Sequence, residues 1–143
     1  MMQCIIPHNP AKICYNYSNM IKVLIVDDHA ILREGLIRIV GFDPEIEVAG
    51  SVKNASEAIN FLSGMPVDIV ILDINMPEVS GLDLLEFLRR RAEWKNLPVI
   101  MLSTEAADVT VDKAMKLGAN GYVMKPVTIE ELERAVNNAL QKH

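Results

Sequence analysis

Three aspartates are the residues of this sequence that are best placed to do chemistry. Asp27 and Asp28 close the apolar run 23–26, and Asp73 closes the apolar run 69–72. Four β-prone apolar residues that lead into a carboxylate are typical of a buried parallel strand that ends at a functional edge. Two neighbouring strands of this kind bring three acids together at the carboxyl end of a sheet, where open α/β folds bind their ligands. Because such acids repel one another by roughly 4 kcal/mol for a pair about 4 Å apart, we expect a hard cation such as Mg²⁺ between them.

The elements that must position these acids alternate along the chain. Strand-like runs are expected at 23–27, 46–51, 69–73, 99–103 and 121–124. Apolar residues recur at helical spacing over 32–40, 55–62, 82–88, 114–117 and 129–140. Gly41, Gly64 and Gly118 are expected to end the first, second and fourth helices, and Thr128 with Glu131 forms a capping box before the fifth. This alternation predicts a parallel sheet covered on both faces, a three-layer α/β sandwich.

Composition and charge narrow the class of protein. The chain has 143 residues, of which 50% are hydrophobic, enough for one domain with a core. Its net charge of −5 argues against direct binding to nucleic acid, which needs a basic face. No apolar run approaches a membrane-spanning length, and the first residues lack the apolar stretch of a secretory signal. Cys4 and Cys14 fit no metal-ligand spacing, so we expect a cytoplasmic chain without a disulfide.

Residues 1–20 differ from the rest of the chain. They mix cysteine, asparagine, tyrosine, histidine and proline without a period, and Met20 stands directly before the first predicted strand. We expect a disordered N-terminal extension, or an upstream start that precedes the true one at Met20. A functional arm is the alternative.

A series of short motifs lies at the predicted strand ends. They are Val-Asp-Asp at 26–28, Leu-Asp-Ile-Asn-Met-Pro at 72–77, Gly81, Leu-Ser-Thr-Glu-Ala at 102–106, Gly-Ala-Asn-Gly-Tyr at 118–122 and Lys125-Pro126. Each is weak alone, but in this order they are specific, and through them residues 21–141 resemble a response regulator receiver domain, the CheY-like family of two-component signalling. The resemblance implies a flavodoxin-like sheet of five parallel strands in the order 2-1-3-4-5, flanked by five helices. It also implies a phosphorylation-controlled switch that assists its own phosphorylation and dephosphorylation, without being an enzyme.

The resemblance assigns the acids their roles. Asp73 matches the phosphoacceptor, which forms an aspartyl phosphate. Asp27, Asp28, Asp73 and the backbone carbonyl of Asn75 match the Mg²⁺ ligands, and Asn75 and Glu105 match the positions that tune the phosphoryl lifetime. From the residues alone, a helix N-cap or a turn remains open for Asp73, and an Asx turn for Asp27 and Asp28.

The resemblance also assigns roles to three residues farther along the chain. Lys125 would contact a phosphoryl oxygen or pair with Asp73, and its bond to Pro126 is cis in the family. Ser103 matches the switch hydroxyl, with Thr104 one position beyond. Tyr122 matches the aromatic residue that changes between exposed and buried rotamers, although a half-buried strand position is an equally ordinary explanation.

Neighbouring residues receive structural interpretations. We expect His29 to start the first helix, exposed beside the acids and without a required role. The arginines at 89–91 are expected to form a solvated helix end favoured by the helix dipole, and Met76 to be an ordinary apolar loop residue.

The expected partners follow from the same resemblance. A histidine kinase or a phosphotransfer protein would supply the phosphoryl group, with specificity in surface residues near Leu32, Arg33 and Leu36. A downstream protein target or a homodimer partner would bind the surface formed by the fourth helix, the fifth strand and the fifth helix. Neither direct nucleic-acid binding by this chain nor membrane binding is expected.

Four alternatives are less favoured than this interpretation. Residues 26–36 resemble receivers attached to LuxR-type DNA-binding regulators, but the sequence stops at His143 without such a module, which favours a stand-alone regulator over the receiver portion of a longer protein. A Mg²⁺-dependent aspartyl-phosphate phosphatase of the haloacid-dehalogenase type is disfavoured because those enzymes place an acid where Asn75 stands. A pseudo-receiver is disfavoured by the complete set of site residues, and nucleotide hydrolysis by the lack of a Gly-rich phosphate loop.

Overall fold

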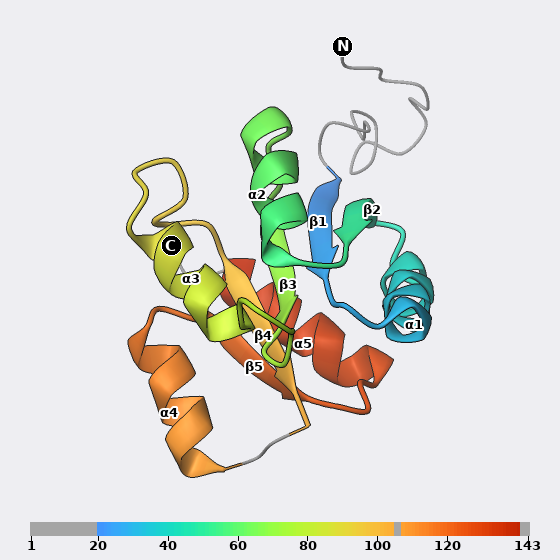
Figure 1. The fold of residues 1–143 in the computed structure, drawn as a ribbon. Helices are drawn as coiled ribbons and strands as arrows, with labels where there is room; N and C mark the ends of the chain where they lie inside the picture. Colours follow the sequence, from blue (N-terminus) through green and yellow to red (C-terminus); the bar gives the residue numbers. More distant parts are fainter. Residues whose placement is uncertain (1–19, 105–106, 141–143) are drawn as a thin grey trace.

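A parallel sheet forms the centre of the structure, a computed structural model that describes residues 20–104 and 107–140 (Figure 1). Its five strands in these residues are β1 (Ile21–Val26), β2 (Ile46–Val52), β3 (Ile69–Asp73), β4 (Val99–Ser103) and β5 (Gly121–Met124). They lie in the order β2-β1-β3-β4-β5, and every neighbouring pair is parallel. The expected fold class and strand order are confirmed, and β1 begins two residues earlier than its apolar run.

Helices cover both faces of the sheet. They are α1 (Ala30–Gly41), α2 (Ala55–Gly64), α3 (Gly81–Arg89), α4 (Asp108–Lys116) and α5 (Ile129–Leu140). Because successive strand residues point to opposite faces, Val23 and Ile25 pack with α1 and α5, whereas Leu24 and Val26 pack with α2, α3 and α4. The two groups of helices can be followed in Figure 1. The sandwich therefore has two apolar cores, one on each side of the sheet.

Local sequence signals set several helix ends. Gly41 and Gly64 are the last residues of α1 and α2, as expected. Gly118 follows the end of α4 with a φ of +106°, a backbone conformation that glycine adopts without strain. Thr128 caps α5 by accepting a hydrogen bond from the Glu131 backbone N–H at 3.2 Å. The Glu131 carboxylate also accepts a hydrogen bond from the Thr128 hydroxyl. The second bond of this capping box therefore joins the two side chains.

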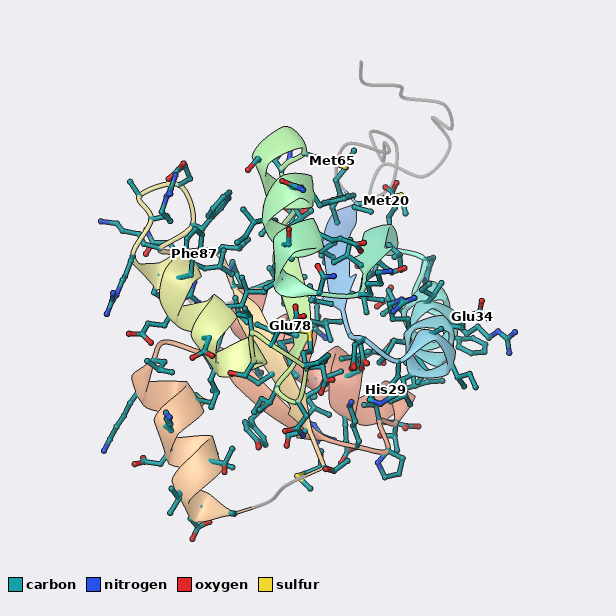
Figure 2. The ribbon with its side chains drawn as sticks, viewed as in Figure 1. Met20, His29, Glu34, Met65, Glu78 and Phe87 are labelled. Atoms are coloured by element: carbon teal, nitrogen blue, oxygen red, sulfur yellow. The ribbon has the colours of Figure 1, made fainter. Side chains whose placement is uncertain are left out.

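The strand order places the loops that follow β1 and β3 side by side. Val26 pairs with Leu72 in the sheet, so the residues that follow them, Asp27 and Asp73, leave the sheet next to each other. In Figure 2, His29 marks this carboxyl end, and Met20 and Met65 mark the opposite end. Residues 1–19 lie outside the described part of the chain, so the disordered extension stays a prediction.

Arg89 contradicts the expectation of a solvated arginine run at 89–91. Its guanidinium donates to the backbone carbonyl of Gly118 at 2.8 and 3.1 Å, to that of Trp94 at 3.1 Å and to Asn120 Oδ1 at 2.9 Å. Burial lowers the pKa of Arg89 from its ordinary value. The side chain therefore ties the end of α3 to the turn between α4 and β5. Arg90 and Arg91 are exposed, as expected.

We expect the substitution Arg89→Met to lower the free energy of unfolding by about 1–3 kcal/mol. Methionine keeps a flexible apolar stem but leaves the carbonyl groups at the α4–β5 turn without donors in a partly buried place. The matched change Arg90→Met removes an exposed ion pair with Glu86 and is expected to cost less than about 0.5 kcal/mol. Urea unfolding of both variants measures the difference. Equal losses in the two would show that the Arg89 contacts add no stability.

Candidate functional site

Two fully buried carboxylates and one lysine form the centre of the site. Asp27 and Asp73, beside each other at the ends of β1 and β3, have side chains with 0% exposure, and the Lys125 side chain is 12% exposed. Lys125 Nζ donates to Asp27 Oδ2 at 3.2 Å and to Asp73 Oδ1 at 3.0 Å. One ammonium group thus bridges two carboxylates that lie 46 positions apart in the sequence. The bond between Lys125 and Pro126 is cis.

The loop backbone fixes both carboxylates. The backbone N–H of Asn75 donates to Asp73 Oδ1 at 3.2 Å, and that of His29 donates to Asp27 Oδ1 at 2.9 Å. Each aspartate therefore makes a turn bond two residues ahead, as the structural alternative anticipated. The same bonds hold the carboxylates toward Lys125, so the turn and the charged site are parts of one arrangement.

Two buried oxygens of the acids, Asp73 Oδ2 and Asp28 Oδ1, have no hydrogen-bond partner within the described part of the chain. Asp28 Oδ1 lies 3.1 Å from His29 Nδ1, but the two groups are not oriented for a hydrogen bond. Asp27, Asp28, His29 and Asp73 each offer a ligand atom, and these atoms lie within 4.8 Å of one another. Buried carboxylate oxygens that lack donors fit a hard divalent cation such as Mg²⁺.

Burial shifts the pKa of Asp73. Loss of hydration raises the pKa of its carboxyl group above the ordinary value, and the negative charge of Asp27 acts in the same direction. The hydrogen bond and charge of Lys125 and the hydrogen bond from Asn75 lower the pKa but do not cancel the rise. In the metal-free protein the ionised Asp73 therefore lowers the stability of the fold.

This raised pKa predicts that Asp73→Asn is more stable than the wild type at neutral pH in the presence of EDTA. Below the ordinary carboxyl pKa the group is protonated in both the folded and the unfolded chain and contributes nothing. As the pH rises from that value to the raised pKa of the folded state, only the unfolded chain loses its proton, so the wild type loses stability. Above the raised pKa this loss of stability stays constant.

Urea unfolding of both proteins between pH 7 and pH 4 tests this. The advantage of Asp73→Asn should shrink as the pH falls through that window, and contributions from other groups largely cancel in the difference. A wild type that is the more stable at neutral pH, or a difference that does not change with pH, would contradict the prediction.

The loop between β3 and α3 packs closely against Asp73. The Gly81 N–H donates to the carbonyl of Ile74 at 2.8 Å, and a Cβ on Gly81 would meet the Asp73 carbonyl oxygen. Glu78, in the same loop (Figure 2), has a φ of +69°. Met76 is an apolar residue of this loop, as expected, and it is also buried, at 7% exposure, in the core beneath it. The loop that follows Asp73 is thus held by the Gly81 hydrogen bond and by the burial of Met76.

Ser103 lies at the end of β4, 1% exposed, and its carbonyl accepts from the Lys125 backbone N–H at 2.8 Å. Thr104 is exposed. Asn75 is exposed in the loop after β3, and Glu105 lies outside the described residues. The backbone contacts bring Ser103 to the same edge of the sheet as Lys125, whereas its role as a switch stays a prediction.

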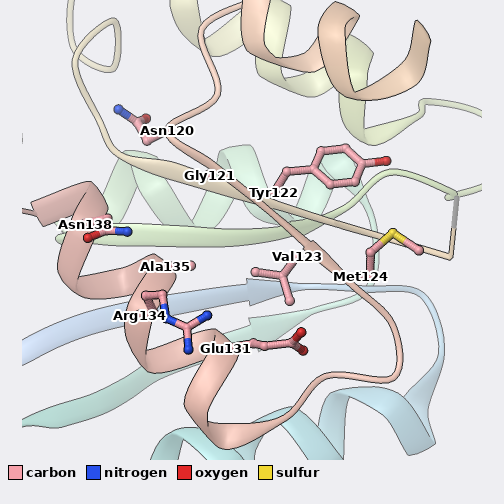
Figure 3. Close-up of a pocket in the computed structure, with 9 residues that line it drawn as sticks. All are labelled: Asn120, Gly121, Tyr122, Val123, Met124, Glu131, Arg134, Ala135 and Asn138. Atoms are coloured by element: carbon pink, nitrogen blue, oxygen red, sulfur yellow. The ribbon is translucent and has the colours of Figure 1, made fainter. Parts of the chain in front are cut away.

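Tyr122 lies apart from the acids, half-buried on β5. It points to the side of the strand opposite Val123, whose side chain faces α5 (Figure 3). A shallow pocket of about 290 Å³ opens between β5 and α5, and its lining includes Tyr122, Arg134 and Glu131. This pocket belongs to the surface on which a protein partner was expected.

The first helix departs from expectation in two residues. Leu36 is 4% exposed, so it cannot belong to the surface expected to select a kinase, whereas Leu32 is 41% exposed. Arg33 Nη1 donates to the Asp27 backbone carbonyl at 2.7 Å and so holds the site as well as facing outward. His29 is the N-cap residue of α1 and is exposed beside the carboxylates, as expected.

Within the described residues, no helix is both long and apolar enough to span a bilayer. The profile of the family described as "Response regulator receiver domain" matches residues 23–137. Nitrate/nitrite response regulator protein NarL of Escherichia coli K12 is 33% identical over 117 residues, which are 82% of this chain and 53% of that protein. The chain therefore spans about half the length of this curated relative.

Solved structures with the same fold include a chemotaxis protein and a two-component response regulator. Vibrio cholerae chemotaxis protein CheY4 has a TM-score of 0.78 at 28% identity, covering 85% of this chain and 99% of that one. A two-component response regulator of the LuxR family from Aurantimonas sp. SI85-9A1 has a TM-score of 0.79 at 27% identity, covering 85% of each chain.

Proposed function

Because this chain belongs to the response regulator receiver domain family of two-component systems, we propose that it is a signalling switch that accepts a phosphoryl group on Asp73. The observation that carries the proposal is the position of that carboxylate. It is buried at the end of a central strand, with one oxygen 3.0 Å from Lys125 Nζ and the other without a hydrogen-bond partner. A carboxylate in this position is a nucleophile whose charge is only partly offset.

The proposed reaction is in-line transfer from a phosphohistidine of a partner kinase or phosphotransfer protein. An oxygen of Asp73 attacks phosphorus, the P–N bond breaks, and the imidazole leaves with the electron pair of that bond. Asp27, Asp28 and Asp73, with the Asn75 carbonyl, would hold Mg²⁺, which neutralises charge on the transferred phosphoryl group. The Lys125 ammonium, which donates to an Asp73 oxygen before transfer, can then donate to a phosphoryl oxygen instead. Hydrolysis of the acyl phosphate resets the switch. In this proposal the domain assists its own phosphorylation and dephosphorylation and is not an enzyme.

The proposed output is a population shift. Moving a 1:99 equilibrium to 99:1 takes about 5.5 kcal/mol of differential stabilisation. New charge-assisted hydrogen bonds from Ser103 and Lys125 to the phosphoryl group would supply part of it. The surface formed by α4, β5 and α5, with the pocket beside Tyr122, is the place we propose for a target protein or a second copy.

Two further parts of the proposal concern the rest of the chain. We propose that 21–141 is the receiver unit and that 1–20 is an extension outside it. The relation to NarL supports the alternative that this receiver works with a LuxR-type DNA-binding domain, because the match covers about half of that protein. The open reading frame of the gene distinguishes a stand-alone regulator from that arrangement.

Intact mass after incubation with acetyl phosphate tests the function. We expect the gain of one phosphoryl group with Mg²⁺, no gain with EDTA, and no gain for Asp73→Asn. Asp68→Asn is the matched control, because Asp68 is exposed at the opposite end of the same strand. A gain that survives in Asp73→Asn, or no gain from either acetyl phosphate or a phosphohistidine donor, would refute the proposal.

A further inference from the structure

The imidazole of His29 lies at the mouth of the acidic site and has no role in the proposed phosphoryl transfer. Its Nδ1 atom is 3.1 Å from Asp28 Oδ1 and 3.3 Å from Asp27 Oδ1. The side chain is 61% exposed, so it is not held there by a surrounding core. It is the one nitrogen donor among the four residues of the described chain that could hold a metal ion together.

These distances fit ligands of a common ion. Divalent first-row ions bind imidazole nitrogen at about 2.0–2.1 Å and carboxylate oxygen at about 2.0–2.2 Å. Adjacent ligands at such distances are therefore about 3.0 Å apart around an octahedral ion and about 3.4 Å apart around a tetrahedral ion. The two separations measured from His29 Nδ1 lie within this interval.

A second observation concerns an oxygen of the site that has no donor among the described residues. Asp73, whose side chain is fully buried, has an oxygen, Oδ2, with no hydrogen-bond partner, although its other oxygen contacts Lys125. Asp73 also offers a ligand atom within 4.8 Å of the His29 nitrogen. The Lys125 ammonium thus leaves one Asp73 oxygen available as a ligand for a metal ion.

We infer that this site binds a transition ion of the Ni²⁺ and Zn²⁺ class, with His29 Nδ1 as the nitrogen ligand, in competition with Mg²⁺. Mg²⁺ prefers oxygen ligands and gains little from an imidazole. Ni²⁺ and Zn²⁺ are bound well by imidazole and, in general, more tightly than lighter divalent ions by a given set of ligands. His29 therefore sets which divalent ions occupy the site. This inference rests on the proposed function in one respect, because the three aspartates are ligands in both.

Calorimetric titration of the full chain with Ni²⁺ and, separately, with Mg²⁺ tests the inference. The substitution His29→Phe keeps a planar ring and removes the nitrogen, and its exposed position should leave the fold intact, which circular dichroism checks. We expect Ni²⁺ affinity to fall roughly tenfold or more and Mg²⁺ affinity to change less than about threefold. Excess Mg²⁺ should weaken Ni²⁺ binding to the wild type competitively.

Two controls separate the possible failures. Replacing the other two histidines, His8 and His143, with phenylalanine should leave the Ni²⁺ affinity unchanged. Asp28→Asn should weaken both ions. If His29→Phe leaves Ni²⁺ binding unchanged, or weakens both ions equally, the inference is overturned while the phosphoacceptor proposal stands. If Asp28→Asn alters neither affinity and the protein gains no phosphoryl group, both fail together.

Discussion

Replacing Lys125 with methionine is expected to destabilise the metal-free protein by about 3–5 kcal/mol. Among the described residues, the Lys125 ammonium is the one side-chain cation that lies within hydrogen-bond distance of both buried carboxylates, at 3.2 Å from Asp27 and 3.0 Å from Asp73. Methionine matches the length of the stem but leaves two like charges buried side by side. Removing one partner of a buried ion pair costs more than the pair contributed, because the remaining charge has lost its hydration.

Urea unfolding in EDTA measures this loss of stability, and two further variants serve as controls. Lys116→Met removes an exposed lysine, 77% accessible, from an ion pair with Asp112 and should cost less than about 0.5 kcal/mol. The double variant Lys125→Met with Asp73→Asn removes one of the stranded charges and should recover much of the stability. A loss under about 1 kcal/mol for Lys125→Met would mean that the ammonium does not bridge the acids in solution.

The same substitution should also slow phosphorylation from acetyl phosphate. Lys125 offsets the charge of Asp73 and offers a donor to the incoming oxygens. Removing one such donor typically costs about 10²–10³ in rate where it stabilises developing charge. Comparing the rate with the stability of the same variant separates the two contributions, because a purely structural lysine would leave the rate of the folded fraction unchanged.

The strands of the sheet and the acids at their ends were predictable because buried strands have a recognisable local sequence. Strands covered on both faces read as unbroken apolar runs, and every residue of β3 is buried. An aspartate that follows such a run indicates the end of the strand, where a carboxylate can find a charged partner. Asp27 and Asp73 therefore indicated the edge of the sheet at which the acids meet, whereas the strand order came from the family resemblance.

Contacts between distant segments were not predictable in this way. Arg89 looked like its two neighbours, and only the fold brings the Gly118 carbonyl, 29 residues away, against its guanidinium. Met76 is buried because its loop folds back over a core, which no period of the sequence records. The contact of Arg33 with the Asp27 carbonyl depends on how α1 leaves β1. Side chains of ordinary type take such roles from tertiary structure alone.

Gly81→Ala is expected to lower the free energy of unfolding by about 3 kcal/mol or more. The first residue of α3 lies against the backbone that carries Asp73. An added Cβ would lie 2.8 Å from Ile74 Cα and still closer to the Asp73 carbonyl oxygen. Both are backbone atoms beside the central strand, so a rotamer change cannot relieve the contact. Either α3 or the end of β3 must move.

The displacement should affect function as well, because it acts at the phosphoacceptor itself. A shift of about 1 Å at a reacting group can cost roughly 10² in rate, so we expect phosphorylation of Gly81→Ala from acetyl phosphate to be at least tenfold slower. Gly35→Ala is the matched control. Gly35 lies within α1 with open space where the Cβ would be, and alanine there should stabilise the protein by up to about 1 kcal/mol. Wild-type stability and rate in Gly81→Ala would show that α3 does not rest on the Asp73 backbone, and the glycine would then need another explanation.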